Sequence, residues 1–131
     1  MPTPAKAKPP SLNASPLLQT LTETDGKRTV GVLTWHVANP SEGVMQVLDV
    51  RVDGEFARQG IGSRLLNQAI TNAAADCRSR GGKLRRVFVA LAHEEQILAR
   101  AFFTRHGFHH VHTLKDLLRS QDLLTYVKSY D

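Results

Sequence analysis

The sequence is poor in cysteine and in aromatic residues, and it has no long apolar run. Cys77 is the only cysteine among the 131 residues, which excludes an internal disulfide and a cysteine-rich zinc site. No stretch approaches the ~18 consecutive apolar residues that a membrane-spanning helix needs. The first residues also lack the apolar core of a secretory signal peptide. These absences predict a cytoplasmic protein with no membrane partner.

The sequence has an excess of positive charge. Seventeen Lys and Arg residues against twelve Asp and Glu residues give a net charge of +5 at pH 7. This balance favours an anionic ligand, but it does not distinguish a nucleotide from a nucleic acid or a lipid surface. The basic residues are not interleaved with aromatic ones in the manner of single-strand binders, so no specific nucleic-acid partner is expected.

Length and composition predict one domain that follows a short tail. Residues 1–15 are rich in proline, alanine and lysine and show no apolar period, so we expect them to be disordered. Residues 16–131 match the usual size of a single domain, about 100–150 residues.

Three segments typical of strands follow the tail. We expect strands over the ranges Leu17–Thr24, Thr29–Val37 and Val44–Val52. The connections contain the turn signals Asp25-Gly26 and Asn39-Pro40, and they are too short for crossover helices. An antiparallel meander is therefore predicted. Strict alternation would place residues 44, 46, 48, 50 and 52 on one face of the third strand.

The second half of the chain alternates helices and strands. Apolar spacing predicts one helix over Gly62–Arg80, ended by Gly81 and Gly82. A second helix is expected with Glu94 and Glu95 in its first turn and with an apolar stripe made of Ile97, Leu98, Ala101 and Phe102. Further expected elements are a strand buried on both faces over Leu84–Leu91, a short strand over His109–His112, a helix over Leu114–Leu118 and a final strand over Leu123–Tyr130. Together these elements predict a mixed α/β sheet with one parallel pair around the first helix.

The segment with the clearest chemical signal is the start of the first helix. A short loop follows the strand Val44–Val52, and Gly60-Ile61-Gly62 then opens the helix, where glycines allow backbone N–H groups to approach an anion at a helix N-terminus. Arg58 and Arg64 flank this loop and could add charge-assisted contacts. The same glycines would equally serve a tight turn without a ligand. Neither a P-loop nor a dinucleotide fingerprint fits, because no lysine follows Gly62 and Leu65 occupies the third glycine position.

At this loop the sequence resembles the GNAT family of N-acetyltransferases. Members share a loop Q/R-x-x-G-x-G/A that cradles the diphosphate of coenzyme A, and the matching residues here are Ala57-Arg58-Gln59-Gly60-Ile61-Gly62. A later family motif is N-x-x-A-x-x-L-Y-x-x-x-G-F, and the residues in those places are Gln96, Ala99, Phe102, Phe103, Gly107 and Phe108. The resemblance covers about Thr29–Tyr130.

This resemblance implies an acetyl-CoA-dependent N-acetyltransferase that acts directly on an amine of a small molecule or peptide. It also implies an antiparallel N-terminal meander, a central parallel strand pair splayed at a bulge, and helices on both faces of the sheet. Implied contacts to coenzyme A are Val50 and Val52 for the pantetheine arm, and Arg58, Gln59, Gly60, Ile61, Gly62 and Ser63 for the diphosphate. Direct attack needs no nucleophilic side chain, so Cys77 is expected to be a core thiol.

Several positions depart from the family pattern. Ala57 replaces the usual Gln or Arg, and Phe103 stands where many members have a tyrosine that protonates the leaving thiolate. Gln46 lies where some members carry a glutamate base. The chain also has a turn where the family commonly has two helices that shape the acceptor site, and a second subunit, as in a homodimer, could supply the missing wall.

The resemblance leaves the general base open. Candidates are Asp49, Glu55 and His36, with His93 as a further one. Asp49 lies on the relevant strand, but its parity puts it opposite Gln46 unless the bulge rotates it, and it could be a solvated strand residue. Glu55 could be an ordinary loop acid, and His36 a half-buried surface histidine.

A metal site and a second function class are the remaining questions that the residues raise. Histidines at 106, 109, 110 and 112 lie close in sequence, and His110 and His112 would share a strand face. No acidic or cysteine partner accompanies them locally, so no metal site is expected. The missing tyrosine and glutamate favour a second function class, a non-catalytic acyl-CoA-binding module.

Overall fold

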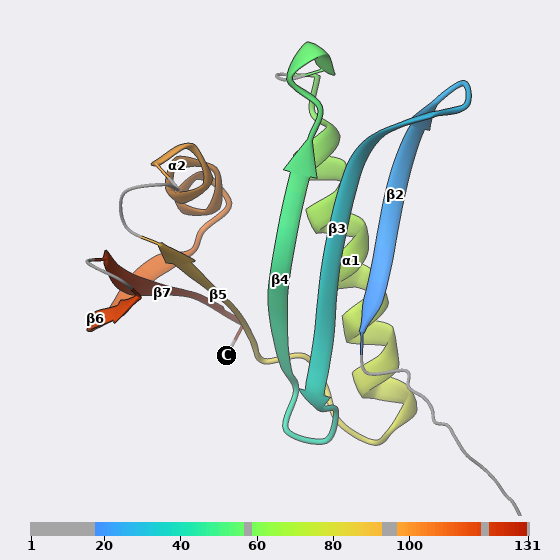
Figure 1. Cartoon of the computed structure of the whole chain (residues 1–131). Coiled ribbons are helices and arrows are strands. Elements are labelled where there is room, and N and C mark those ends of the chain that lie inside the picture. The colour runs from blue at the N-terminus through green and yellow to red at the C-terminus, as the bar shows by residue number, and fades with distance from the viewer. Residues whose placement is uncertain (1–17, 57–58, 93–96, 119–120, 131) are drawn as a thin grey trace, which may run out of the picture.

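The computed structural model describes residues 18–56, 59–92, 97–118 and 121–130. These residues form a six-stranded sheet and two helices (Figure 1). The elements are β2 Gln19–Asp25, β3 Arg28–Asn39, β4 Val44–Val52, the 3₁₀ turn η1 Gly54–Phe56, α1 Ile61–Ser79, β5 Arg86–Ala92, α2 Ile97–Arg105, β6 His109–Leu118 and β7 Gln121–Ser129. The predicted tail and the acids Glu94 and Glu95 lie outside the described residues.

The strand order is β2-β3-β4-β5-β7-β6. β2, β3 and β4 pair antiparallel, which confirms the predicted meander. β4 and β5 pair parallel, with α1 between them in sequence, while β5, β7 and β6 pair antiparallel. Figure 1 shows the two halves of the sheet diverging, with β4 on one side and β5 on the other. The mixed sheet with its central parallel pair is therefore as the sequence predicted.

The parallel pair is short and then separates. Only four residue pairs join the two strands, from Val44↔Arg86 to Val47↔Val89. Beyond them β4 continues along β3, and β5 continues along β7. A bulge in β4 coincides with the separation, because Trp35 pairs with Val47 while Thr34 pairs with Asp49, leaving Leu48 without a partner on β3.

The bulge reverses which residues of β4 face the core. Met45 and Val47 are buried, and beyond the bulge Val50 and Val52 pack against the same core. The predicted alternation of residues 44, 46, 48, 50 and 52 on one face is therefore wrong. A single extra residue shifts the period-two pattern by one position, and this shift depends on pairing with β3.

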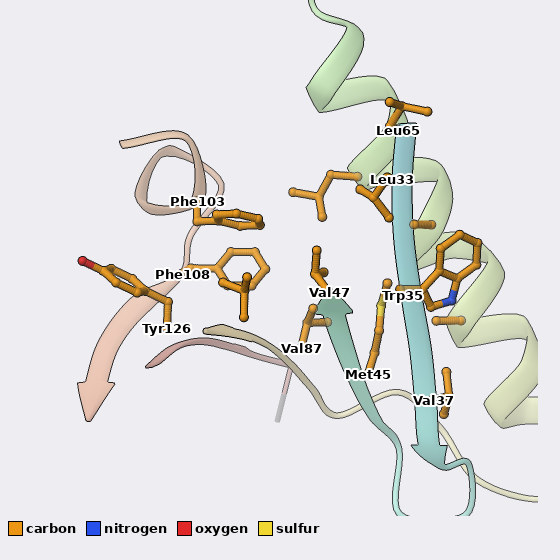
Figure 2. Close-up of a cluster of buried hydrophobic side chains, with 14 of the residues drawn as sticks. Leu33, Trp35, Val37, Met45, Val47, Leu65, Val87, Phe103, Phe108 and Tyr126 are labelled. Atoms are coloured by element: carbon orange, nitrogen blue, oxygen red, sulfur yellow. The ribbon is translucent and has the colours of Figure 1, made fainter. Parts of the chain in front are cut away.

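One hydrophobic cluster holds the sheet and both described helices together. α1 contributes the buried residues Ile61, Leu65, Leu66, Ala69, Ala73 and Cys77. α2 contributes Phe103, which lies with Phe108 beside the side chains of Val47 and Val87 (Figure 2). The sequence suggested helices on both faces, whereas the two helices in the described part of the chain share one.

β5 shows one buried face only. Val87, Val89 and Leu91 are buried, while the alternate residues Phe88 and Ala90 are half-buried. The prediction of burial on both faces is therefore wrong. The reason is that both described helices cover the same side of the sheet, so the second face of β5 keeps partial access to solvent.

Two predictions for the C-terminal part are also wrong. The expected apolar stripe of α2 is largely exposed, since Ile97 is 65% and Leu98 86% accessible, and Phe103 makes the buried contact instead. Residues 114–118 belong to β6 and do not form a helix. Leu114 pairs with Leu123 and Leu118 with Gln121, so contacts with β7 extend this segment as a strand in place of the expected helix.

The ends of α1 agree with the sequence to within one residue. Gly81 has a φ of 86°, a left-handed conformation that glycine adopts without strain. The N–H of Gly82 donates to the carbonyl of Cys77 at 2.9 Å, and the N–H of Gly81 donates to that of Arg78 at 3.1 Å. These bonds close the last turn of the helix in the manner expected of a glycine cap.

Candidate active-site cleft

A cleft of about 540 Å³ opens where β4 and β5 separate. β4 forms one wall with residues 47–50 and 52, and β5 and α2 form the other with residues 89–91, 97–99, 102 and 103. Gly62, in the first turn of α1, also lines the cleft and lies next to Val52 of β4. Among the described residues that line the cleft, Asp49 is the one ionisable residue, and the other lining side chains are apolar.

The separated strands leave backbone groups without a strand partner along the cleft. Beyond Val47 and Val89 no pairing joins β4 to β5 in the described residues. The edges of both strands that face the cleft can therefore bond to an extended, amide-bearing ligand, much as a peptide adds to a sheet edge. Val50 and Val52, the expected neighbours of a pantetheine arm, do line this cleft.

α1 begins at the cleft without a side-chain cap. Gly60 is the N-cap residue, with φ 77° and ψ 10°, and the described residues provide no side-chain cap hydrogen bond. Its carbonyl accepts the N–H of Arg64 at 3.0 Å. The first N–H groups of an α-helix have no partner within the helix, so an uncapped N-terminus offers donors to an anion. Gln59 and Gly60 are exposed, and Arg58 lies outside the described residues.

Gly62 has a packing role that the sequence did not reveal. A Cβ atom at this position would lie 3.2 Å from the ring of Phe102, which is tighter than an ordinary van der Waals contact. The missing side chain therefore lets the first turn of α1 approach α2 closely. Glycine at this position is explained by contact between the helices as well as by access of an anion to the backbone.

Arg64 does not point to an anion site in this structure. Its guanidinium forms an ion pair with Glu23 of β2, and its Nη1 donates to the carbonyl of Gln59 at 3.0 Å. The hydrogen bond from Arg64 lowers the pKa of the Glu23 carboxyl, and the same bond raises the pKa of Arg64. Arg64 thus fixes the loop to β2, and the sequence-based expectation of a direct anion contact is not supported.

His106 joins α1 to the end of α2. Its Nε2 lies 2.9 Å from the Oγ of Ser63, and its ring lies 4.7 Å from that of Phe102. Partial burial lowers the pKa of His106, and the positive charges of Arg105 and Lys128 lower it further. The sequence grouped His106 with the other histidines. Ser63 lies 43 residues earlier, so no pattern in the sequence around His106 indicates this contact.

We expect the free energy of unfolding to decrease between pH 7.5 and pH 5.5 because of His106. A histidine with a lowered folded pKa stabilises the fold fully above the unfolded pKa of about 6.5, and this stabilisation is lost as the pH falls through the window between the two values. Urea unfolding at both pH values measures the difference, and His106→Gln should reduce it.

The matched control is His112→Gln, at an exposed position on β6, which should preserve the pH dependence. Glu23 and Asp53 have lowered pKa values and lose their stabilisation only below about pH 4.5, outside the window. If the free energy of unfolding depends on pH equally in wild type and in His106→Gln, another group is responsible for the dependence.

Two of the three candidate bases lie on one face of the sheet. Asp49 pairs with Thr34 and Gln46 pairs with His36, so the bulge brings Asp49 onto the face that carries His36 and Gln46. The carboxylate of Asp49 accepts a bond from the Nε of Arg51 at 2.7 Å. The Nε2 of His36 lies 3.2 Å from the Oε1 of Gln46. Of these side chains, Asp49 lines the cleft.

Glu55, the third candidate base, lies away from the cleft. Its carboxylate accepts a bond from Arg28 at 2.8 Å, and Asp53 binds the same guanidinium at 2.6 Å. The backbone N–H of Glu55 bonds to Asp53, which, together with Arg28, lowers the pKa of that carboxyl. Glu55 is 68% exposed and does not line the cleft, so its contacts are structural. His93 lies outside the described residues.

Phe103 lines the cleft but offers no proton. It is 1% exposed, and its ring makes edge contacts with Phe102 at 5.1 Å and Phe108 at 5.0 Å. At the position where many family members have a tyrosine, Phe103 thus serves as a packed core residue. Cys77 is buried, and burial raises the pKa of its thiol, which agrees with the expected core role.

The histidines of β6 do not converge. His110 pairs with Tyr126 and His112 with Thr125, because a bulge lies between them. Since neighbouring residues of β7 face opposite sides, His110 and His112 point to opposite faces, and the prediction of a shared face is wrong. Within the described ranges, no group of three or more histidine, cysteine, aspartate or glutamate side chains could hold a metal ion.

A bulged strand that parts from its parallel neighbour beside an uncapped helix N-terminus is the arrangement that the GNAT resemblance implied. The family model of the acetyltransferase (GNAT) family matches residues 6–108. The chain therefore belongs to the GNAT acetyltransferase family. No curated protein sequence matches it significantly.

Solved structures show the same fold at low sequence identity. A GNAT-family protein from Desulfovibrio desulfuricans has a TM-score of 0.73 and 21% identity, covering 86% of this chain and 69% of its own. An acetyltransferase from Bacillus cereus has a TM-score of 0.67 and 16% identity, with 86% and 73% covered. A GNAT acetyltransferase from Elizabethkingia anophelis with acetyl-CoA bound has a TM-score of 0.70 and 12% identity, with 87% and 77% covered.

The comparison extends over both halves of the sheet, since each match covers more than four fifths of the chain. No helix in the described part is long and apolar enough to cross a membrane.

Proposed function

We propose that the protein transfers the acetyl group of acetyl-CoA directly to an amine of a small molecule or peptide. The observation that carries this proposal is the cleft between β4 and β5, at whose end α1 begins uncapped. Such a site offers a strand edge to an amide-bearing arm and helix N–H groups to a diphosphate. Family membership supports the reaction class.

We place the diphosphate on the backbone between Arg58 and Ser63, which includes Gln59, Gly60, Ile61 and Gly62. The pantetheine arm would then follow β4 at Val50 and Val52, with the thioester near the bulge at Leu48. This direction is supported by the order of residues along β4, since a Cβ at Gly62 would lie 3.8 Å from Val52, whereas Val47 is the last residue of β4 that pairs with β5.

The reaction would need no nucleophilic side chain. The amine nitrogen attacks the thioester carbonyl carbon, the N–C bond forms, the C–S bond breaks, and the thiolate of coenzyme A leaves. A backbone N–H near the bulge would stabilise the oxyanion of the tetrahedral intermediate. The amine proton passes to a base or to water, and the thiolate finally takes a proton from solvent.

Magnitudes indicate which missing group matters more. An alkylamine with a pKa near 10.4 is about 10⁻³ neutral at pH 7, a handicap of ~4–5 kcal/mol, whereas a thiolate with a pKa near 8.5 needs only ~2 kcal/mol of help. Absence of a tyrosine at Phe103 is therefore tolerable. The base is the more demanding role, and Asp49 or His36, directly or through water, is the candidate that the described face offers.

We expect acetyl-CoA to bind, and an amine panel to accelerate release of free thiol. Isothermal titration calorimetry measures binding, and a thiol reagent measures turnover, with acetyl-CoA alone as the hydrolysis control. Absence of heat with millimolar acetyl-CoA would remove both the enzyme and the binding module from consideration.

The second candidate function is a non-catalytic acyl-CoA-binding module. The side chain of Phe103 carries no hydroxyl group, and the carboxylate of Asp49 is bonded to Arg51, which favours this alternative. Binding of acetyl-CoA without amine-dependent thiol release would support the module. A cytoplasmic location and a homodimer stay predictions from the sequence.

A further inference from the structure

Exposed apolar side chains gather at the mouth of the cleft. Three of the seven exposed large hydrophobic residues in the described ranges line it: Leu48 at 43%, Ile97 at 65% and Leu98 at 86% exposure. Leu48 is the bulged residue of β4, and the other two begin α2 on the opposite wall. Clustered exposed aliphatic groups around a concave site are typical of a surface that contacts a ligand.

The same cleft carries one charge among its described lining residues. Asp49 follows Leu48 directly, and its side chain is 43% exposed, so the carboxylate is reachable from solvent. Arg51 contacts one of its oxygens and is itself 76% exposed. A carboxylate has acceptor capacity for more than one donor, so an ammonium group can bind beside Arg51.

Resting on the proposed function, we propose that the acceptor is an amphipathic amine. Its ammonium group binds at Asp49, and its apolar body lies against Leu48, Ile97 and Leu98. Among the described lining residues, a second cationic group of the acceptor would meet aliphatic side chains, where loss of hydration disfavours it. Amines such as alkylamines and arylalkylamines are therefore preferred over polyamines.

The three exposed side chains Leu48, Ile97 and Leu98 form the rim of the cleft. We assign this rim to the acceptor because of its position and chemistry. The amide groups of pantetheine can form hydrogen bonds with the unpaired strand edges, which lie along β4 and β5 inside the cleft. The side chains of Ile97 and Leu98 instead extend from α2 into solvent. They are available to the ligand that enters last and attacks the thioester near Leu48.

A homologous amine series tests the proposal. Calorimetry with propylamine, butylamine, hexylamine and octylamine, each added to the protein saturated with coenzyme A, gives the Kd for each amine. We expect the Kd to fall by about twofold to fourfold per methylene, as burial of each CH₂ predicts. Putrescine and spermidine should bind more weakly than hexylamine.

Two variants separate the rim from the rest of the surface. Leu98→Gln should reduce the dependence on chain length and leave the Kd of acetyl-CoA unchanged. Leu18→Gln, at a residue that is 64% exposed and lies outside the cleft, is the matched control and should leave the series as in wild type. Asp49→Asn should weaken hexylamine while leaving hexanol unaffected.

Each remaining outcome has a defined meaning. A Kd that does not change with chain length, no binding of any alkylamine, or tighter binding of spermidine than of hexylamine overturns the amphipathic acceptor. A Leu98→Gln variant that weakens acetyl-CoA and keeps the amine series also overturns it, since the rim would then belong to the co-substrate. Absence of acetyl-CoA binding in wild type instead contradicts the proposed function itself.

Discussion

Replacement of Ser63 by aspartate is expected to weaken acetyl-CoA binding by on the order of 100-fold at pH 8 without unfolding the protein. Two unit charges ~5 Å apart at an effective dielectric constant of ~20 interact by about 3 kcal/mol, and each 1.4 kcal/mol is a factor of ten. A carboxylate in the first turn of α1 would repel a diphosphate bound there. Calorimetry with acetyl-CoA measures the loss.

The same change should leave the fold intact or slightly stabilise it. An acid in the first turn of a helix is favourable by about 0.3–1 kcal/mol. The side chain could also keep a bond to His106, which now contacts the Ser63 hydroxyl at 2.9 Å. Opposite signs for ligand affinity and for the free energy of unfolding would therefore distinguish a lost anion site from a damaged structure.

The matched control is Asn67→Asp, on the exposed side of the same helix one turn later. It introduces the same charge away from the N-terminus and should change the acetyl-CoA affinity much less. Equal losses in both variants would indicate a general charge effect. Unchanged affinity in Ser63→Asp would contradict the placement of the diphosphate on this turn.

Replacement of Gly43 by alanine is expected to cost about 3 kcal/mol or more of stability. Gly43 has a φ of 73°, and an added Cβ would come within 1.9 Å of the carbonyl oxygen of Lys83. A left-handed conformation costs an alanine about 1–2 kcal/mol, and forced overpacking typically adds about 1–3 kcal/mol. Urea unfolding followed by circular dichroism measures the change.

This glycine also sets the geometry of the cleft. Its carbonyl accepts the N–H of Arg85 at 2.8 Å and that of Arg86 at 3.1 Å, which holds the start of β5 against β4. A shift here would move the start of β5 relative to β4, and with it the short paired segment beyond which the two strands diverge. We therefore expect Gly43→Ala to lower acetyl-CoA affinity as well as stability.

Gly26→Ala is the control for the conformational cost alone. Gly26 has a φ of 64°, but a Cβ there would meet no atom within 4 Å. It should lose only about 1–2 kcal/mol, as expected for a left-handed alanine. A loss in Gly43→Ala no larger than that in Gly26→Ala would show that the β4–β5 junction absorbs the added methyl group.

Features governed by neighbouring residues were readable from the sequence. β4 runs over Val44–Val52 as predicted, and α1 ends beside Gly81 and Gly82 because local backbone geometry sets a helix end. The glycine-opened start of α1 was readable for the same reason. So was the meander, since short connections leave adjacent strands no other pairing.

Features that depend on distant contacts were not readable. A helix was expected over residues 114–118, yet the structure places them in β6, which pairs with β7. An apolar stripe on α2 was expected to be buried, but Ile97 and Leu98 face the cleft mouth because Phe103 already fills the core beneath. In each case a packing or pairing partner lies far away in sequence.

By itself the sequence determined the order of the elements except over residues 114–118, and it determined the loop that opens α1, because turns, caps and periodicity act over a few residues. Only the tertiary structure decided which side chains meet at the cleft. The bulge at Leu48 brought Asp49 onto the face of His36, and the ion pair between Glu23 and Arg64 ties the loop that opens α1 to β2. Register between strands and contacts between separate elements fix such positions, and no local pattern encodes them.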